Sequence, residues 1–148
     1  MDKNLVSEFE ENLRTQGMDA TLKILNQRVS HRFTAIFRLD KDRLEIVQLV
    51  DKLNDSSTAP LSPVPFDNSF CELVMRDGAV MTSNSVTDKR FDGKFSQGVV
   101  ISYVGLPLVQ PGGGLFGSLC HIDYKENRID EDEFVFLQNI AGVVSRYV

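Results

Sequence analysis

The stretch "SYVGLPLVQPGGGLFGSLCHIDY", residues 102–124, decides the fold. Two segments rich in strand-forming residues, 99–109 and 115–124, flank the turn sequence "QPGGG". Pro107 argues that the first segment is an edge, a bulge or the end of a strand, because proline donates no ladder hydrogen bond. Pro111 and the glycines after it favour a tight turn. We therefore predict a β-hairpin across this stretch.

The same glycines have the G-x-G-x-x-G spacing of a dinucleotide-binding loop, with Gly112, Gly114 and Gly117. That loop works only between a strand and a helix, because the helix N-terminus faces the phosphates. Here the alternating segment "SLCHIDY" follows, and the next helix signal comes only at Asp130. The chain also lacks repeated β-α-β units and the G-K-[ST] of a P-loop. We interpret the glycines as a hairpin turn.

The two ends of the chain carry helical patterns. Leu5, Phe9 and Leu13 share one face of a helix predicted over 2–15, and a second helix is predicted over 19–29. The last helix begins at a D-x-x-E capping signature. It is apolar over a wide arc made of two adjacent stripes, Leu137, Ile140, Ala141, Val144 and Val148 in one and Phe136, Val143 and Tyr147 in the other. The arc packs entirely on the sheet or partly on a partner helix, and the sequence favours neither.

The middle of the chain alternates between strands and loops. Residues 32–51 predict a β-hairpin, 54–68 a proline-rich loop, and 69–77 a short helix. A short strand is predicted over 79–84, followed by a loop or a single helical turn to residue 98. The element order predicts an α+β protein, an antiparallel sheet with helices packed on it. We assign 1–148 to one domain, with the 1–17 helix as a candidate dimerisation element.

Composition excludes several classes of function. The 148 residues carry a net charge of −5, with 21 acidic and 16 basic residues, and no basic cluster that would bind a nucleic acid. The N-terminus is acidic, unlike a signal peptide, and no apolar stretch is long enough to span a membrane. There are only two cysteines. We expect a cytoplasmic protein whose partners include neither nucleic acid nor membrane.

The order of motifs from residue 19 to the end resembles a GAF domain. The C-terminal half of that family reads Tyr-x-Gly-x-Pro-Leu, a glycine hairpin, Leu-Gly-x-Leu-Cys, an acid and a helix. The matching residues here are Tyr103, Gly105, Pro107, Leu108, Phe116, Gly117, Ser118, Leu119, Cys120 and Asp123. Upstream, the Phe-Cys helix and the Asp-x-Arg-Phe segment are matched by Phe70, Cys71, Asp88, Arg90 and Phe91.

The resemblance implies five or six antiparallel strands with the N- and C-terminal helices on one face. A short helix and loops would cover the other face and enclose a small-molecule pocket. It implies a sensory module acting through a homodimer of its terminal helices or through a signalling partner protein. The candidate ligand-binding residues are Cys71, Asp88, Phe91, Phe95 and Tyr103. Residues 84–98 would form either a lid over the ligand or a solvated loop anchored by its two phenylalanines. We expect no catalytic residue, cofactor or metal.

The cysteines leave two alternative interpretations. Cys71 follows a predicted helix cap, which lowers a thiol pKa, so it is either a reactive thiol or a small apolar filler. Cys120 and His121 point to opposite faces of a strand and therefore cannot both bind one metal ion; we expect Cys120 to share its face with Phe116, Ser118 and Ile122.

Two functional alternatives follow from the family. The first is a thiol-based redox enzyme or sensor that uses Cys71, related to free methionine-(R)-sulfoxide reductase. That enzyme uses cysteines in the segment before the Tyr-x-Gly-x-Pro strand, and this chain has none there. We therefore do not expect an enzyme. The second alternative is a dimerisation scaffold without a ligand.

Overall fold

The computed structural model describes residues 3–55 and 61–148 and confirms the α+β class. The predicted loop 54–68 therefore falls partly outside the described residues. The elements are α1 (Lys3–Gln16), α2 (Met18–Gln27), β1 (Phe33–Asp40), β2 (Arg43–Asp51), β3 (Val64–Pro65), α3 (Phe70–Asp77), β4 (Val80–Thr82), the 3-10 turn η1 (Lys89–Phe91), β5 (Ser102–Val109), β6 (Leu115–Asp123) and α4 (Glu131–Val144).

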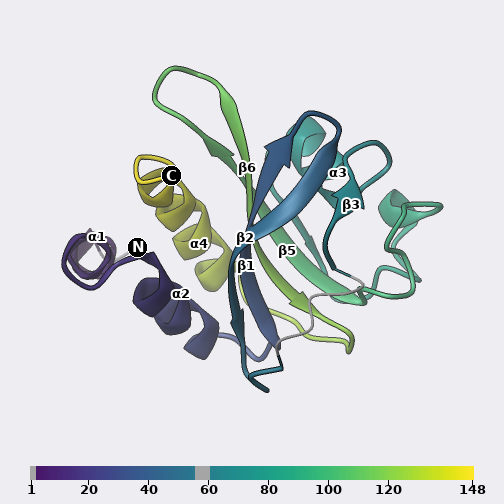
Figure 1. Cartoon of the computed structure of the whole chain (residues 1–148). Helices are drawn as coiled ribbons and strands as arrows, with labels where there is room; N and C mark the ends of the chain where they lie inside the picture. Colours follow the sequence, from purple (N-terminus) through teal and green to yellow (C-terminus); the bar gives the residue numbers. More distant parts are fainter. Residues whose placement is uncertain (1–2, 56–60) are drawn as a thin grey trace.

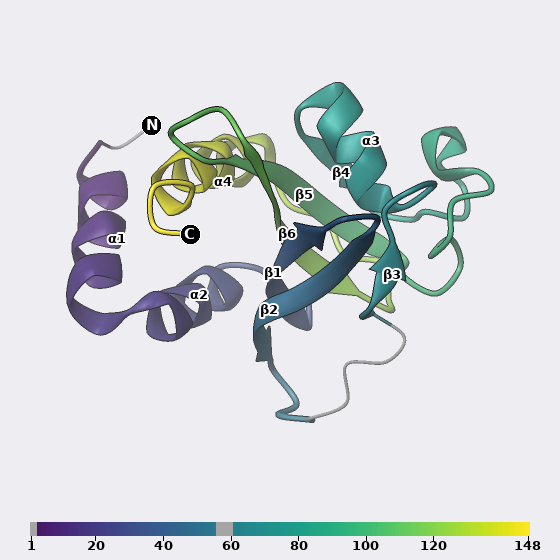
Figure 2. The same ribbon diagram turned by 45° about the horizontal axis from the view of Figure 1, so that its top comes forward.

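The six strands form one antiparallel sheet in the order β3-β2-β1-β6-β5-β4. Both predicted hairpins, β1–β2 and β5–β6, are confirmed. Helices α1, α2 and α4 lie on one face of the sheet, whereas α3 and the η1 loop lie on the other (Figures 1 and 2). This is the arrangement that the resemblance implied.

The cap predicted at Asp130 is confirmed, and of the two candidate caps before α3, Asn68 and Ser69, the structure selects Ser69. Ser69 Oγ accepts the Glu72 N–H at 3.1 Å at the start of α3. Asp130 Oδ1 accepts the Glu133 N–H at 2.8 Å at the start of α4. These bonds satisfy N–H groups that a helix leaves free at its first turn, so each helix begins where its cap lies.

The wide arc of α4 is used mainly within the chain. Both stripes contribute to the core on the helix side of the sheet, where Phe136, Leu137, Ile140 and Val143 are buried. At the C-terminal end Glu10 of α1 accepts the Tyr147 hydroxyl at 2.8 Å. Helix α1 of the same chain therefore contacts part of the α4 surface that was predicted to pack either on the sheet or on a partner helix.

One predicted side-chain direction is wrong. Phe116 packs against the core on the helix side of the sheet, whereas Cys120 belongs to the core on the opposite side. The cause is a bulge, because Leu108 pairs with Gly117 and the next residue, Val109, pairs with Leu115. The extra residue interrupts the alternation of side chains along β6.

Gly117 lies where two strand backbones approach closely. A Cβ atom built on this residue would meet the carbonyl oxygen of Phe37 at 1.8 Å. No larger residue fits without moving β1 away from β6, so the second glycine of the family pattern has a structural reason here.

Candidate functional site

A cavity of about 40 Å³ lies between the sheet and α3, on the face opposite the terminal helices. The sheet contributes Phe37, Leu44, Val64, Tyr103, Ser118 and Ile122 to its lining. The rest comes from the start of α3 and from neighbouring loops, through Ser69, Phe70, Cys71, Leu61, Ser96 and Val100. The site therefore collects residues from segments that are far apart in the sequence.

Tyr103 is held over the strand that carries it. Its hydroxyl oxygen would lie 2.5 Å from a Cβ atom on Gly105, so only glycine at that position leaves room for the ring. The ring packs edge-on against Phe70 at 5.2 Å between centroids, and Phe70 packs edge-on against Phe91 at 4.6 Å. The three aromatic side chains form a rigid wall beside the cavity.

Two hydroxyls and two thiols form a neutral polar cluster at the cavity. The Tyr103 hydroxyl and the Ser118 hydroxyl each lie 3.3 Å from the Cys120 sulfur, which is a weak hydrogen-bonding partner. Burial raises the pKa of Cys120 to about 11 and that of Cys71 to about 12. For Cys71 this is the opposite of the lowering expected at a helix N-terminus, because desolvation is the larger effect.

The five predicted site residues are not all brought together. Cys71 and Tyr103 line the cavity. Phe91 is fully buried and packs behind it, whereas Phe95 is 57% exposed. Asp88 lines a separate open groove beside β4, and its ion pair with Arg90 at 2.7 Å lowers its pKa.

The segment that carries Phe95 is fastened to the start of α3. The Asn68 side chain donates to the Gly93 carbonyl at 2.7 Å, and the Asn68 carbonyl accepts the Phe95 N–H at 2.9 Å. Lys94 pairs with Glu72 at 3.2 Å. These three contacts hold the loop against the helix, so that Ser96 reaches the cavity lining.

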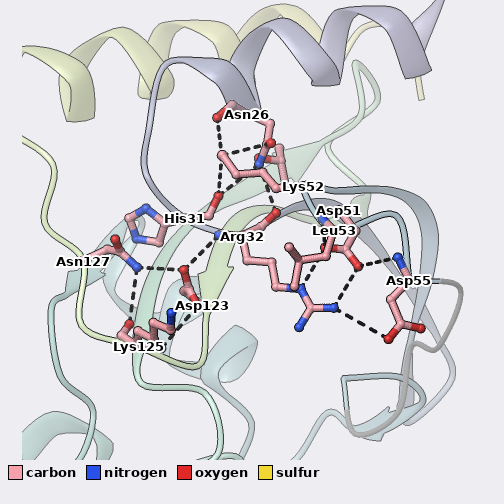
Figure 3. A network of polar contacts seen from close by, with 11 residues as sticks. Asn26, His31, Arg32, Asp51, Lys52, Leu53, Asp55, Asp123, Lys125 and Asn127 are labelled. Carbon is pink, nitrogen blue, oxygen red and sulfur yellow. Dashed lines mark hydrogen bonds and ion pairs between the residues drawn. The ribbon is translucent and has the colours of Figure 1, made fainter.

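A polar network on the other side of the molecule explains the acid of the family pattern (Figure 3). Asp123 accepts the Arg32 N–H at 3.0 Å, the Asn127 side chain at 2.8 Å and the Lys125 N–H at 3.2 Å. The Arg32 guanidinium binds both carboxylate oxygens of Asp51 and lowers its pKa. Asp123 thus joins the end of β6 to the residue before β1, a structural role.

Two buried histidines lie close together on the helix side of the sheet, with ring centroids 5.8 Å apart. Lys52 donates to Asn26 Oδ1, which turns the Asn26 amide nitrogen toward Thr34, 2.9 Å away. The Thr34 hydroxyl and His121 Nδ1 share a hydrogen bond at 2.7 Å, which leaves Nε2 as the other ring nitrogen of His121.

That Nε2 and both ring nitrogens of His31 have no hydrogen-bond partner among the described residues. Desolvation lowers the pKa of His31 to about 4 and that of His121 to about 3. Both rings are therefore neutral at pH 7, and they make this side of the molecule sensitive to acid.

Cys120 and His121 lie on opposite faces of β6, as predicted from strand alternation. The described residues contain no cluster of three or more His, Cys, Asp or Glu side chains that would bind a metal ion. Ser118 and Ile122 were expected beside Cys120, and strand alternation could have added them to the site. The cavity also includes Phe37, Leu44 and Val100, which reach it only because distant strands and loops come together in the fold.

Among the same described residues, no helix is long and apolar enough to cross a membrane.

No protein-family model matches the sequence, and no curated protein matches it significantly. Solved structures do match. The GAF domain of an Acinetobacter phosphoenolpyruvate-protein phosphotransferase has a TM-score of 0.74 at 15% identity, over 98% of this chain and 92% of that one. The phycocyanobilin-bound GAF domain from a cyanobacterial phytochrome has a TM-score of 0.72 at 15% identity, over 97% and 91%.

Free methionine-R-sulfoxide reductase from Neisseria meningitidis, solved in complex with its substrate, has a TM-score of 0.71 at 16% identity, over 95% of this chain and 83% of that one. At such identities the likeness concerns the fold, and these proteins differ in what they bind and do. The sheet order, the placement of the helices and these structural neighbours lead to one conclusion. The chain has the fold of a GAF domain.

Proposed function

We propose that this protein is a sensory module that binds a small molecule in the cavity beside α3. The observation that carries the proposal is the cavity itself, which is bordered by a rigid aromatic wall and has the hydroxyls of Tyr103 and Ser118 at one side. An apolar pocket with a few convergent polar groups is the usual form of a small-molecule site.

The signal would travel through the sheet to the terminal helices. Neighbouring residues of β5 and β6 face opposite sides, so Tyr103 lines the cavity while Val104 packs under the helices. A ligand that shifts Tyr103 therefore changes the packing below α4. Leu5 of α1 and Val135 of α4 remain 38% and 39% exposed, and we propose them as contacts to a second copy or to a partner protein.

Thermal unfolding of the protein with a panel of small metabolites at millimolar concentrations tests the binding. We expect at least one metabolite to raise the melting temperature of the wild type, an effect that is lost in the cavity-filling variants Ser118→Leu and Val100→Phe and kept in the surface variant Ser30→Leu. Circular dichroism checks that each variant is folded. If no metabolite raises the melting temperature and native mass spectrometry of the protein purified from its own cells finds no retained molecule, the alternative of a ligand-free scaffold is favoured.

Sedimentation velocity at micromolar concentration tests the route through a second copy. We expect a dimer that Leu5→Glu together with Val135→Glu dissociates. A wild-type monomer under these conditions would contradict the homodimer and leave a partner protein as the route.

A thiol-based reductase is the second candidate function. Cys71 lines the cavity, Cys120 lies beside Ser118, and solved reductases share the fold. The raised pKa values oppose it, because the nucleophile in thiol chemistry is the thiolate. Turnover of free methionine-R-sulfoxide with dithiothreitol decides between the two. Turnover that is lost in Cys71→Ser would support the reductase, whereas none is expected for the sensor.

A further inference from the structure

We infer that the cavity selects an uncharged molecule of a few non-hydrogen atoms that carries one hydrogen-bonding group. This inference rests on the proposed function and names the ligand class for the same site. Three properties of the cavity lead to it: the charge of its lining, the partners of its hydroxyls and its volume.

The lining of the cavity carries no charge. All twelve side chains that line it are uncharged, and the stretch 56–60, which lies outside the described residues, also lacks charged residues in the sequence. Both thiols remain protonated at pH 7 because of their raised pKa values. Lys94 and Glu72, in the loop contact nearby, neutralise each other at 3.2 Å and do not line the cavity. A charged ligand would lose its hydration without gaining a counter-charge, which costs several kcal/mol.

The hydrogen-bonding requirement comes from Tyr103 and Ser118. Both side chains are almost completely buried, and each hydroxyl lies 3.3 Å from the Cys120 sulfur. The Ser118 hydroxyl also interacts with the side chains of Tyr103 and Cys71. Sulfur is a poor substitute for oxygen or nitrogen in this role. A ligand hydroxyl or carbonyl that reached this pair would replace the contacts to sulfur with stronger hydrogen bonds to oxygen. The remaining lining is mostly aliphatic and aromatic, which suits a short carbon chain.

The volume limits the size of the ligand. A cavity of about 40 Å³ is far smaller than the roughly 300 to 1,000 Å³ of a site for a drug-sized ligand, so it admits only a molecule of a few non-hydrogen atoms. A ligand of that size gains at most about 1.5 kcal/mol per non-hydrogen atom, so its Kd is about 1 mM or weaker.

A titration with three probes of similar size tests the charge rule: ethanol, ethylammonium and formate. The readout is the ¹³C-methyl chemical shift of Val64, Val100 and Ile122 in the cavity, with Leu137 and Val144 on the helix side as internal controls. We expect ethanol to saturate the cavity methyl shifts in the millimolar range, and each ion to bind at least tenfold more weakly at matched ionic strength. Ser118→Ala should weaken ethanol severalfold, and Val100→Phe should abolish its binding, whereas Ser30→Ala should change nothing.

Each result bears on a different claim. If formate or ethylammonium saturates the same methyl shifts as tightly as ethanol, the charge rule is overturned while the proposed function stands. If Ser118→Ala binds ethanol as well as the wild type, the hydrogen-bonding rule is overturned. If no probe binds but native mass spectrometry finds a larger retained molecule, the size rule is overturned. If neither method finds a ligand, the proposed function fails as well.

Discussion

The two faces of the sheet differ in how they bury polar groups. On the helix side, the apolar core adjoins two neutral histidines, next to the charges of Lys52 and Asp123. Three of the four ring nitrogens of these histidines have no hydrogen-bond partner among the described residues. On the other side, the core holds only neutral hydroxyls and thiols and leaves a cavity. Both faces are built from the same strands, so the difference arises from the side chains that alternate along them.

This difference separates two roles. A buried group that titrates makes stability depend on pH, whereas a neutral group beside an empty space can exchange a weak partner for a ligand. The helix face is therefore the side that makes stability depend on pH, and the cavity face is the side where a molecule can bind.

The largest loss of stability is expected at Gly117, because the pairing of β1 with β6 at this residue supports both faces of the sheet. Gly117→Ala would place a methyl group against the Phe37 carbonyl, and neither backbone can move without separating β1 from β6. We expect a loss of roughly 3 kcal/mol or more, or no folded protein at all. Urea unfolding measures it, with Gly112→Ala as the matched control because space around Gly112 is open. Equal stability of the two variants would show that the strands are not this tightly paired.

The cavity face should keep its thiols unreactive. A pKa of about 12 for Cys71 lowers its thiolate fraction at pH 7 roughly a thousandfold relative to an exposed thiol, and about 11 for Cys120 lowers it roughly a hundredfold. Alkylation by iodoacetamide, followed by mass spectrometry with and without urea, measures both rates. Labelling of native Cys71 as fast as that of the unfolded chain would contradict the neutral character of this face.

The helix face should be sensitive to acid. Because both histidine pKa values are lowered on folding, the unfolded chain binds protons first as the pH falls below about 6.5. Stability is complete above that pH and decreases toward pH 4, by about 2 kcal/mol per histidine at pH 5. The urea midpoint at pH 7.5 and at pH 5 measures the loss. His31→Phe should remove about half of it, and an unchanged loss in that variant would point to other groups.

The smallest expected change in stability comes from adding one methyl group on each face, and its sign should differ between the two faces. Val100 lines the cavity, whereas Val104 is buried under the helices. Val100→Ile places a methyl group into empty space and should stabilise the protein by up to about 0.8 kcal/mol. Val104→Ile adds the same group to a filled core and should cost about 1 kcal/mol or more. Thermal unfolding compares the pair, and two equal losses would mean that the cavity is not available space.

The elements of the fold could be predicted from the sequence because their signals are local. The caps at Ser69 and Asp130 and the glycine turn before residue 115 each act within a few residues. The direction of Phe116 could not be predicted, since the bulge arises from pairing with Val109 across the hairpin.

The site could be predicted only in part for the same reason. Cys71 and Tyr103 were found through the family pattern, but Phe37 and Val100 reach the cavity through contacts between distant segments. Asp88 and Phe95 are residue types that suit a ligand site, but neither lines the cavity. The ion pair with Arg90 holds Asp88 away from it, and the hydrogen bond from the Phe95 N–H to the Asn68 carbonyl holds Phe95 away from it. Sequence spacing alone does not contain that information.

The face opposite the terminal helices contains an accessible, neutral and mostly apolar cavity. A crystal structure of the protein pressurised with xenon tests it most directly, since xenon occupies apolar cavities without regard to hydrogen bonding. We predict xenon between α3 and the sheet, in contact with Tyr103 and Val100, and no xenon there in Val100→Phe. Xenon found only on the helix face, or nowhere in the protein, would contradict the account.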